Sequence, residues 1–500
     1  MQPFGSSGKR GIIMLELLKK EASKALTLNG GQTYSTSGSH CLDLFFRAGA
    51  MRNVASAEIA DVVRCAFAED PARTMKILFF TRDVRGGLGE RRFFRIALQT
   101  LAKEEPDAVL RNIGYIPEYG RFDDLCALLH TPCEDAAISL IRSQLDADRK
   151  AMSARAHVSL LAKWLPSVNA SAEAARRDGR YIAQKLGMSD RNYRKCLSAL
   201  RRYSDILENR LRTSDYSFSY EAQPSGALFK YRKAFIRNDG ERYKSFLNMV
   251  DRGEATIHTA ALYPYEIVRK CSGSLEAEER RSLDLTWRNL PAYGESAENA
   301  IAVIDGSGSM ICSIHSNVPP IEVALSLGLY FAEHNQGVFA NHFITFSRTP
   351  QLIEIKGRDI AEKVQYCRSF REVANTDLEA VFRLILDTAV RNRVPQSELP
   401  VKLFIISDME FDGCVEGGNS QPLYDTMRSL YANAGYQLPQ VVFWNVNSVQ
   451  KNIPVRFGTS GTALVSGFSP SLFDSVMGGE LEPQLIMDRA ILCERYAVIS

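Results

Sequence analysis

The sequence predicts an α-helical array followed by an α/β domain built on a doubly wound parallel sheet. The chain has 500 residues, more than one ordinary core holds, so at least two domains are expected. Up to about residue 290, apolar residues recur at spacings of three and four, the period of amphipathic helices. After residues 291–294, strand-like runs alternate with helical ones, which is typical of a parallel sheet. We therefore place the domains at residues 12–294 and 295–500.

The first domain is predicted to be many helices joined by short turns. Glycine and proline interrupt the pattern at residues 29–31, 86–89 and 224–226. No repeat of fixed period is visible, so we expect either an α-solenoid or an irregular array. The clearest helical segments are residues 41–46, 55–67, 75–80, 93–101, 123–129, 136–145 and 158–164.

The second domain is predicted to place its strand ends at one edge. Its run at residues 401–408 is apolar almost throughout, which indicates a strand buried on both faces. Sheets of this kind bind ligands at the carboxyl ends of their strands. We predict strands at 299–305, 341–346, 352–356 (an edge strand), 401–408, 440–446 and 462–465, and helices at 321–334, 377–392, 423–434, 469–476 and 484–493.

Composition indicates a soluble globular protein. It is 45% hydrophobic and 24% charged, as in ordinary water-soluble domains. No apolar run approaches the roughly 18 residues of a membrane helix, so no membrane association is expected. The ten cysteines form no CxxC motif, which argues against zinc and is consistent with reduced thiols. With no signal peptide recognised, we expect a cytoplasmic location.

A pattern for binding a divalent cation follows the first predicted strand. Asp305, Ser307 and Ser309 are spaced two apart, with glycines between them that allow a tight turn. The carboxylate supplies charge and the hydroxyls supply neutral oxygens, and one coordination position stays open for water or a partner's carboxylate. Thr376 precedes a predicted helix, and Asp408 ends another strand. The alternative is an ordinary turn that holds no metal.

This order, Asp-x-Ser-x-Ser, then Thr, then Asp, resembles the metal-ion-dependent adhesion site of von Willebrand factor A domains, over about residues 296–500. The resemblance implies that Asp305, Ser307, Ser309 and Thr376 ligate the ion directly or through water. It implies that Asp408 ligates the ion or orients it through water. Because hydroxyls, waters and few carboxylates suit magnesium, Mg²⁺ is favoured over another divalent cation.

Two further acids, Glu410 and Asp412, follow Asp408. A metal-dependent nuclease or phosphatase could use Glu410 together with Asp305 and Asp408. Because no nucleophile with an attendant base is found nearby, we interpret them as a solvated acidic loop and predict that the chain is not an enzyme. A hydrolase remains the third hypothesis.

Positive charge is concentrated in the helical half. Residues 1–300 hold 46 Lys and Arg against 37 Asp and Glu, and residues 301–500 hold 15 against 21. Residues 151–250 alone hold 19 against 9. The candidate phosphate contacts are Arg176, Arg177, Arg180, Arg191, Arg194, Lys195, Arg201 and Arg202. Tyr181, Tyr193 and Tyr203 lie between them, and arginines with stacking aromatics are typical of RNA binding. The alternative is a solvated helix face with ion pairs.

Glycines and arginines are mixed at residues 82–92, directly before a predicted helix. Such a turn could bind an anion through backbone N–H groups, or it could be a plain turn between helices. It lacks the Lys-Ser/Thr of a nucleotide-binding loop, so ATP is not expected.

Segments at residues 30–39, 82–92, 163–167, 193–201 and 261–268 resemble the uncharacterised family called domain of unknown function 2828, over nearly the whole chain. The order of the domains is also similar to the TROVE module of Ro ribonucleoproteins, so the array is expected to be HEAT-like or TROVE-like. In that module a helical ring holds structured and misfolded RNAs. Its RNA-contacting residues have no counterparts that can be placed here.

These resemblances imply a Ro-like RNA-binding protein. Its array would hold a structured or single-stranded non-coding RNA, and its A domain would dock a protein partner through the cation. The alternative is a metal-dependent protein–protein scaffold without nucleic acid.

Overall fold

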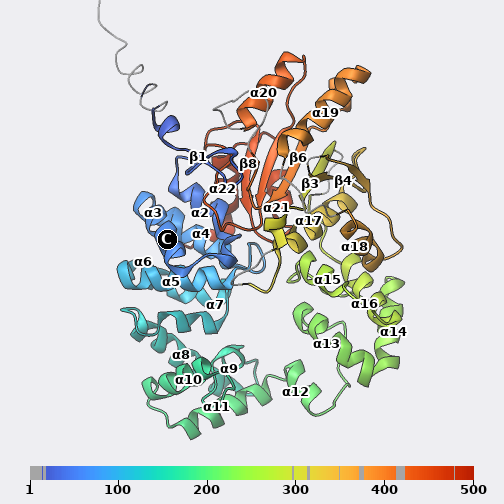
Figure 1. Cartoon of the computed structure of the whole chain (residues 1–500). Coiled ribbons are helices and arrows are strands. Elements are labelled where there is room, and N and C mark those ends of the chain that lie inside the picture. Colours follow the sequence, from blue (N-terminus) through green and yellow to red (C-terminus); the bar gives the residue numbers. More distant parts are fainter. Residues whose placement is uncertain are drawn as a thin grey trace, which may run out of the picture.

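The computed structural model describes residues 14, 18–294, 298–311, 316–347, 349–370, 377–412, 423–477 and 479–500. It confirms a helical N-terminal region followed by a mixed, mostly parallel sheet (Figure 1). In the part of the chain described, no helix has both the length and the apolar character needed to cross a membrane.

The helical region forms an array that leaves the sheet on one side and returns to it on the other (Figure 1). Its helices are α2 (His40–Ala48), α3 (Ser56–Glu69), α4 (Pro71–Arg82), α5 (Arg91–Glu104), α6 (Pro106–Asn112), α7 (Ile116–Tyr119), α8 (Glu134–Ser153), α9 (Leu161–Trp164), α10 (Glu173–Lys185), α11 (Asp190–Tyr203), α12 (Leu207–Arg212), α13 (Ser225–Asn238), α14 (Gly240–Asp251), α15 (Pro264–Lys270) and α16 (Ala277–Arg288). Short 3₁₀ turns, η1 (Met51–Asn53), η2 (Ile113–Tyr115) and η3 (Phe122–Leu128), connect some of them.

A short antiparallel hairpin precedes the array, in a region where no strand was predicted. Its strands are β1 (Lys24–Leu26) and β2 (Gln32–Tyr34). Three-residue strands are too short to show the alternation that identifies a strand. The hairpin is held by the distant sheet domain, since Tyr34 exchanges backbone hydrogen bonds with Ile453 (3.0 and 2.9 Å).

Six strands form the main sheet, in the order β5-β4-β3-β6-β7-β8. All neighbours are parallel except the edge strand β5, which pairs antiparallel with β4. The strands are β3 (Ala300–Asp305), β4 (His342–Phe346), β5 (Leu352–Glu354), β6 (Lys402–Ser407), β7 (Gln440–Asn445) and β8 (Thr462–Ser466). Residues of β3 and β6 are buried throughout, as the apolar runs predicted. These two strands are adjacent and parallel, so their carboxyl ends meet at one edge.

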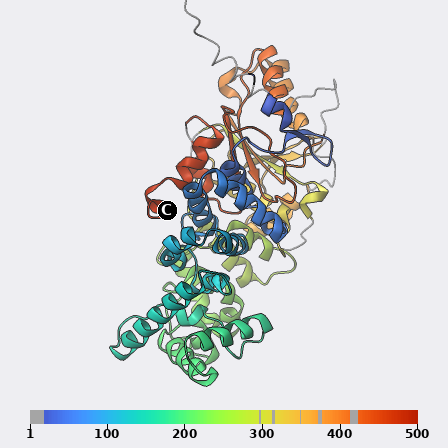
Figure 2. The same ribbon diagram turned by 90° about the vertical axis from the view of Figure 1, so that its left-hand side faces the viewer.

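Helices cover both faces of this sheet (Figures 1 and 2). They are α17 (Pro320–His334), α18 (Ile360–Arg368), α19 (Leu378–Asn392), α20 (Leu423–Asn433), α21 (Leu472–Val476) and α22 (Pro483–Ile491), with the 3₁₀ turns η4 (Gly308–Ile311), η5 (Gln396–Glu398) and η6 (Glu494–Tyr496). Helix α18 was not predicted, because polar residues interrupt its short apolar pattern.

The helical region and the sheet share one hydrophobic core. At the start of the array, α2 packs against β8 and α4 against α22. At its end, α15 packs against α17 and α16 against α18. The array is thus closed into a circuit through the sheet domain. The proposed boundary between residues 294 and 295 remains a prediction.

Both ends of the array also meet each other, at Arg52 in η1. Its Nε donates to both carboxylate oxygens of Glu90 (2.8 and 2.9 Å), just before α5. Its Nη1 donates to the hydroxyl of Tyr265 in α15 (3.3 Å). The guanidinium carbon lies 3.8 Å from the ring centroid of Phe468, which follows β8. One side chain therefore joins the start of the array, its end and the sheet.

The glycine-rich turn at residues 86–89 is part of this junction. Its amides are already used: Leu88 donates to Phe80 O (3.1 Å), Gly89 to Asp83 O (3.0 Å) and Glu90 to Thr81 O (2.7 Å). A Cβ at Gly89 would lie 1.9 Å from the Tyr263 hydroxyl, so only glycine fits against α15. The turn is a packing element, and these amides are not available to bind an anion.

We predict that Arg52→Met lowers the free energy of unfolding by about 3–5 kcal/mol, because it leaves the buried Glu90 carboxylate unpaired. Urea titration followed by circular dichroism measures the change. The double variant Arg52→Met/Glu90→Gln should recover part of the loss.

The matched control is Arg64→Met, which removes an ion pair with Glu104 whose side chains are 47% and 41% exposed. It should cost less than about 1 kcal/mol. Equal losses for Arg52 and Arg64 would contradict the role assigned to Arg52.

Candidate functional site

The carboxyl ends of β3 and β6 bring two predicted metal ligands to one buried edge. Asp305 ends β3, is fully buried, and accepts hydrogen bonds from the Ser307 amide (2.9 Å) and the Ser407 hydroxyl (2.6 Å). Asp408 directly follows β6 and is 5% exposed. The local chain explains the geometry, since the apolar strands must be buried and the first polar residue after each one lies at the sheet edge.

Two hydroxyls complete the described part of the site. The Ser307 and Ser309 hydroxyl oxygens lie 3.0 Å apart in the turn after β3. Ser307 is buried, whereas Gly308 and Ser309 are exposed. The two carboxylates and Ser307 therefore lie inside and Ser309 faces solvent, which leaves the outer side open to water or a partner.

Without a cation between them, the charged forms of the two carboxylates are disfavoured. Burial raises the pKa of Asp305, and the charge of Asp408 raises it further. Burial also raises the pKa of Asp408; a hydrogen bond with Ser309 opposes this and the Glu410 charge adds to it. A cation between the carboxylates would remove the repulsion and restore their charged forms.

Hard oxygen atoms are the donors that this edge offers. Among the described residues, no group of three or more His, Cys, Asp or Glu side chains could hold a metal ion. A cation here would therefore need the serine hydroxyls together with Asp305 and Asp408, a donor set that suits Mg²⁺. Thr376, the fifth predicted ligand, lies outside the described residues. Asp377, next to it, caps α19 by accepting from the Ala380 amide (2.9 Å).

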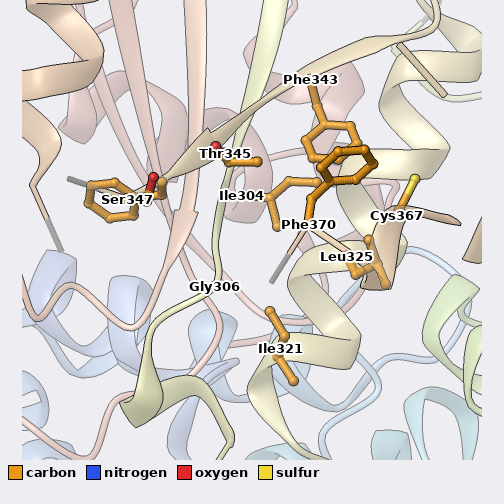
Figure 3. Close-up of a pocket in the computed structure, with 10 residues that line it drawn as sticks. Ile304, Gly306, Ile321, Leu325, Phe343, Thr345, Ser347, Cys367 and Phe370 are labelled. Carbon is orange, nitrogen blue, oxygen red and sulfur yellow. The ribbon is translucent and has the colours of Figure 1, made fainter. Parts of the chain in front are cut away.

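A small apolar cavity of about 30 Å³ lies behind Gly306 (Figure 3). Figure 3 shows Ile304, Phe343 and Phe370 around this space. Sequence reasoning missed Ser347, which lines it, is 2% exposed and directly follows β4. Within the described ranges, its hydroxyl oxygen has no hydrogen-bond partner. A polar residue just after a third parallel strand was the available signal.

The structure corrects the interpretation of Glu410 as a solvated acid. Glu410 is 4% exposed, and both carboxylate oxygens accept hydrogen bonds, from the Leu28 amide (3.1 Å) and the Asn452 side chain (2.6 Å). The sequence could not show this, because Leu28 lies 382 residues away.

Some of the predicted RNA-contacting residues are exposed to solvent, and others are hydrogen-bonded within the protein. Helix α11 turns Tyr193, Leu197 and Leu200 into the core. Because a helix advances about 100° per residue, the opposite face presents a different set. That set, here called the α11 stripe, consists of the exposed residues Arg191, Arg194, Lys195 and Arg202.

The three cations of α10 differ in their exposure and in the contacts that they make. Arg177 is 76% exposed and lies 3.7 Å from Asp178, and Arg180 lies 3.5 Å from Asp190. Arg176 is half-buried and donates to the carbonyl of Ala170 (3.1 Å). All three line a shallow hollow on α10, together with Glu173, Tyr181 and Gln184.

Arg201 does not join the stripe, because it is half-buried and holds the segment after α9. It donates to Ala162 O (2.6 Å), Leu165 O (2.8 Å) and the Ser167 hydroxyl (2.7 Å). Burial lowers the pKa of its guanidinium. All three donor nitrogens are therefore committed to the fold.

The tyrosines expected to stack on bases are also used internally. Tyr193 is fully buried and donates to Pro166 O (3.1 Å), which corrects the prediction for that residue. Tyr203 donates to Ala156 O (2.9 Å), and Tyr181 to Glu134 (2.9 Å). Spacing alone could have revealed Tyr193, which falls on the same helix face as Leu197 and Leu200.

Comparison with known proteins matches both halves of the chain to uncharacterised families. The family model described as Domain of unknown function (DUF2828) matches residues 27–149 and 139–292, more than half of the chain. A second, Domain of unknown function (DUF7788), matches residues 299–487.

The chain is also similar to a viral protein and to a solved structure of low sequence identity. It is 29% identical to Uncharacterized protein L728 of Acanthamoeba polyphaga mimivirus, over 92% of this chain and 85% of that protein. It is 14% identical to the RO (RSR) protein in the crystal structure from Deinococcus radiodurans, with a TM-score of 0.45 over 86% of this chain and 93% of that one.

We predict that neighbouring arginines at the end of α11 behave differently. Arg201→Met should lower the free energy of unfolding by about 2–3 kcal/mol, because three partly buried hydrogen bonds lose their donor. Arg202→Met should change it by no more than about 0.5 kcal/mol, as an exposed substitution. Urea titration of both variants makes the comparison, and equal effects would contradict the assignment.

Proposed function

The chain belongs to the family described as Domain of unknown function (DUF2828), and we propose that this member binds RNA through the α11 stripe. We further propose that it holds a divalent cation at the edge formed by β3 and β6 and docks a protein partner there. The α11 stripe is the observation that carries the RNA proposal.

The stripe has the charge and shape expected of a phosphate-binding surface. Its ends, Arg191 and Arg202, lie about 16 Å apart along the helix axis at 1.5 Å per residue, so it can contact several phosphates of one backbone. Within the described residues, no acidic side chain forms an ion pair with any of the four cations. Unpaired positive charge on one face favours a polyanion through release of its counterions.

RNA is proposed as the polyanion because the order of a helical array and an α/β domain resembles the TROVE module. The buried Tyr193 means that recognition would rest on phosphate contacts more than on base stacking. The same observation favours the second candidate function, a metal-dependent protein scaffold that binds no nucleic acid.

The cation proposal assigns Asp305, Ser307, Ser309, Thr376 and Asp408 as the groups that hold Mg²⁺, as in a von Willebrand factor A-like domain. The supporting geometry is two buried carboxylates at adjacent strand ends, with the buried Ser307 and the exposed Ser309 beside them. When bound, the ion would offer its open position to a partner's carboxylate.

The proposal includes no catalytic step. Both oxygens of Glu410 already accept hydrogen bonds, which argues against its use as a general base. The eight cysteines that the structure describes are unpaired. The cytoplasmic location remains a prediction.

We predict that replacing Arg191, Arg194, Lys195 and Arg202 together with glutamate removes most RNA affinity. Fluorescence anisotropy with a labelled, structured RNA at several salt concentrations measures it. If the four cations each meet a phosphate, wild-type log K should fall with log[salt] with a slope of about −3 to −4, and the variant should show a much shallower slope.

A matched control variant replaces four exposed cations of the sheet domain with glutamate. They are Lys356, Arg391, Lys451 and Arg489. This variant should bind RNA nearly as the wild type does. Equal losses would show that overall charge, rather than the α11 stripe, governs binding, and absence of binding by the wild type would favour the scaffold.

We predict that Asp305→Asn abolishes binding of Mn²⁺, used as a spectroscopic substitute for Mg²⁺, because it removes a charged ligand from the centre of the site. Electron paramagnetic resonance of free Mn²⁺ gives the bound fraction. The control is Asp387→Asn, on the exposed side of α19. Unchanged binding by Asp305→Asn would reject the site.

A further inference from the structure

We infer that Glu410 is a positioning residue of the cation site and that the hairpin β1–β2 holds it in place. This inference rests on the proposed cation site and adds to it a contribution from residues 27–31, which lie nearly 400 positions earlier in the chain.

The first step is the conformation of the chain just after Asp408. Met409 has a positive φ of +66° and is buried. A left-handed conformation costs a non-glycine residue about 1 kcal/mol or more and persists only when its surroundings impose it. On one side, the Met409 amide donates to the Ser407 hydroxyl (3.0 Å), which in turn donates to Asp305. The turn at Met409 therefore sets where the Asp408 carboxylate lies relative to Asp305.

The second step is what holds the other side of this turn. The Glu410 amide donates to the Asp408 carboxylate (3.3 Å). The Glu410 carboxylate accepts from the Leu28 amide and from the Asn452 side chain, so it is anchored on the hairpin and on the segment between β7 and β8. With both oxygens engaged there, its role toward a cation is indirect.

The third step is that the hairpin forms hydrogen bonds and a β-bridge with consecutive residues of the loop after β6. The Thr27 hydroxyl donates to Phe411 O (2.5 Å), and the Asn29 side chain donates to Glu410 O (3.0 Å). Gly30 forms a β-bridge with Asp412. A Cβ at Gly31 would lie 2.4 Å from Phe411 O, so the two backbones touch at van der Waals contact.

Through these contacts the hairpin supports the loop that directly follows Asp408. If the hairpin moves away, Glu410 loses an anchor, the strain at Met409 relaxes, and Asp408 turns away from Asp305. Cation affinity should therefore depend on contacts at residues 27–31, none of which would touch the ion.

The experiment measures Mn²⁺ affinity of the full chain in four variants. Glu410→Ala and Gly31→Ala should each raise the Kd by about tenfold, the lower end of the effect of residues that support metal ligands. Glu410→Gln should keep the Kd within about threefold of wild type, because its amide can still bridge Leu28 and a reoriented Asn452. Gly458→Ala, at an exposed glycine with open space around it, is the matched control and should have no effect.

The glutamine variant separates positioning from charge. If Glu410 acted only through its negative charge near Asp408, Glu410→Gln would weaken binding as much as Glu410→Ala, and the inference would be overturned. RNA affinity, measured in parallel, should stay unchanged in all four variants, because the α11 stripe lies at the other end of the molecule (Figure 1).

Hydrogen exchange provides a second readout that does not depend on the variants folding. Adding Mn²⁺ to the wild type should slow exchange at the amides of Leu28 and Gly31. If the wild type binds Mn²⁺ while those amides and the variant affinities are unchanged, the inference fails and the cation site stands. If the wild type binds no Mn²⁺, both fail. Should Glu410→Ala not fold, Thr27→Val, which removes only the hydroxyl contact with Phe411, takes its place.

Discussion

The architecture depends on one guanidinium group that lies where three parts of the chain converge. Arg52 pairs with Glu90 near the start of the array, contacts Tyr265 near its end, and stacks on Phe468 of the sheet domain. Its partners are largely removed from water, so the interaction is strong only while all three are in place. The circuit of helices that positions the α11 stripe therefore rests on a charged contact as well as on the apolar core.

The two proposed sites lie in halves of the chain that carry opposite excess charge. The helical half carries the excess of basic residues, and four of them are exposed on α11, a helix that lies far from the sheet (Figure 1). The sheet half carries the excess of acidic residues, and two of them are buried at adjacent strand ends. Because the sites lie far apart, an RNA and a protein partner could occupy the molecule together.

Local patterns made part of this structure predictable. Continuous apolar runs located β3 and β6, and the residues after them located Asp305 and Asp408. The same reasoning failed where a role depends on a distant partner. Glu410 was interpreted as a surface acid because its partner, Leu28, lies 382 residues away. Arg201 was interpreted as a phosphate contact because the carbonyl groups that bind it belong to α9 and the residue after it, more than 30 residues earlier. Helical periodicity alone, applied to residues 193, 197 and 200, would have placed Tyr193 in the core.

The packing of α2 against β8 has a consequence for how the chain folds. Residues 40–48 find their native environment only after residues 462–466 have been made and paired. During synthesis α2 therefore leaves the ribosome with an apolar face that stays uncovered until β8 has been made. Long sequence separation between contacting segments slows folding and exposes such surfaces to association. Newly made chains should accordingly depend on chaperones more than a protein of equal size whose domains mature one after the other.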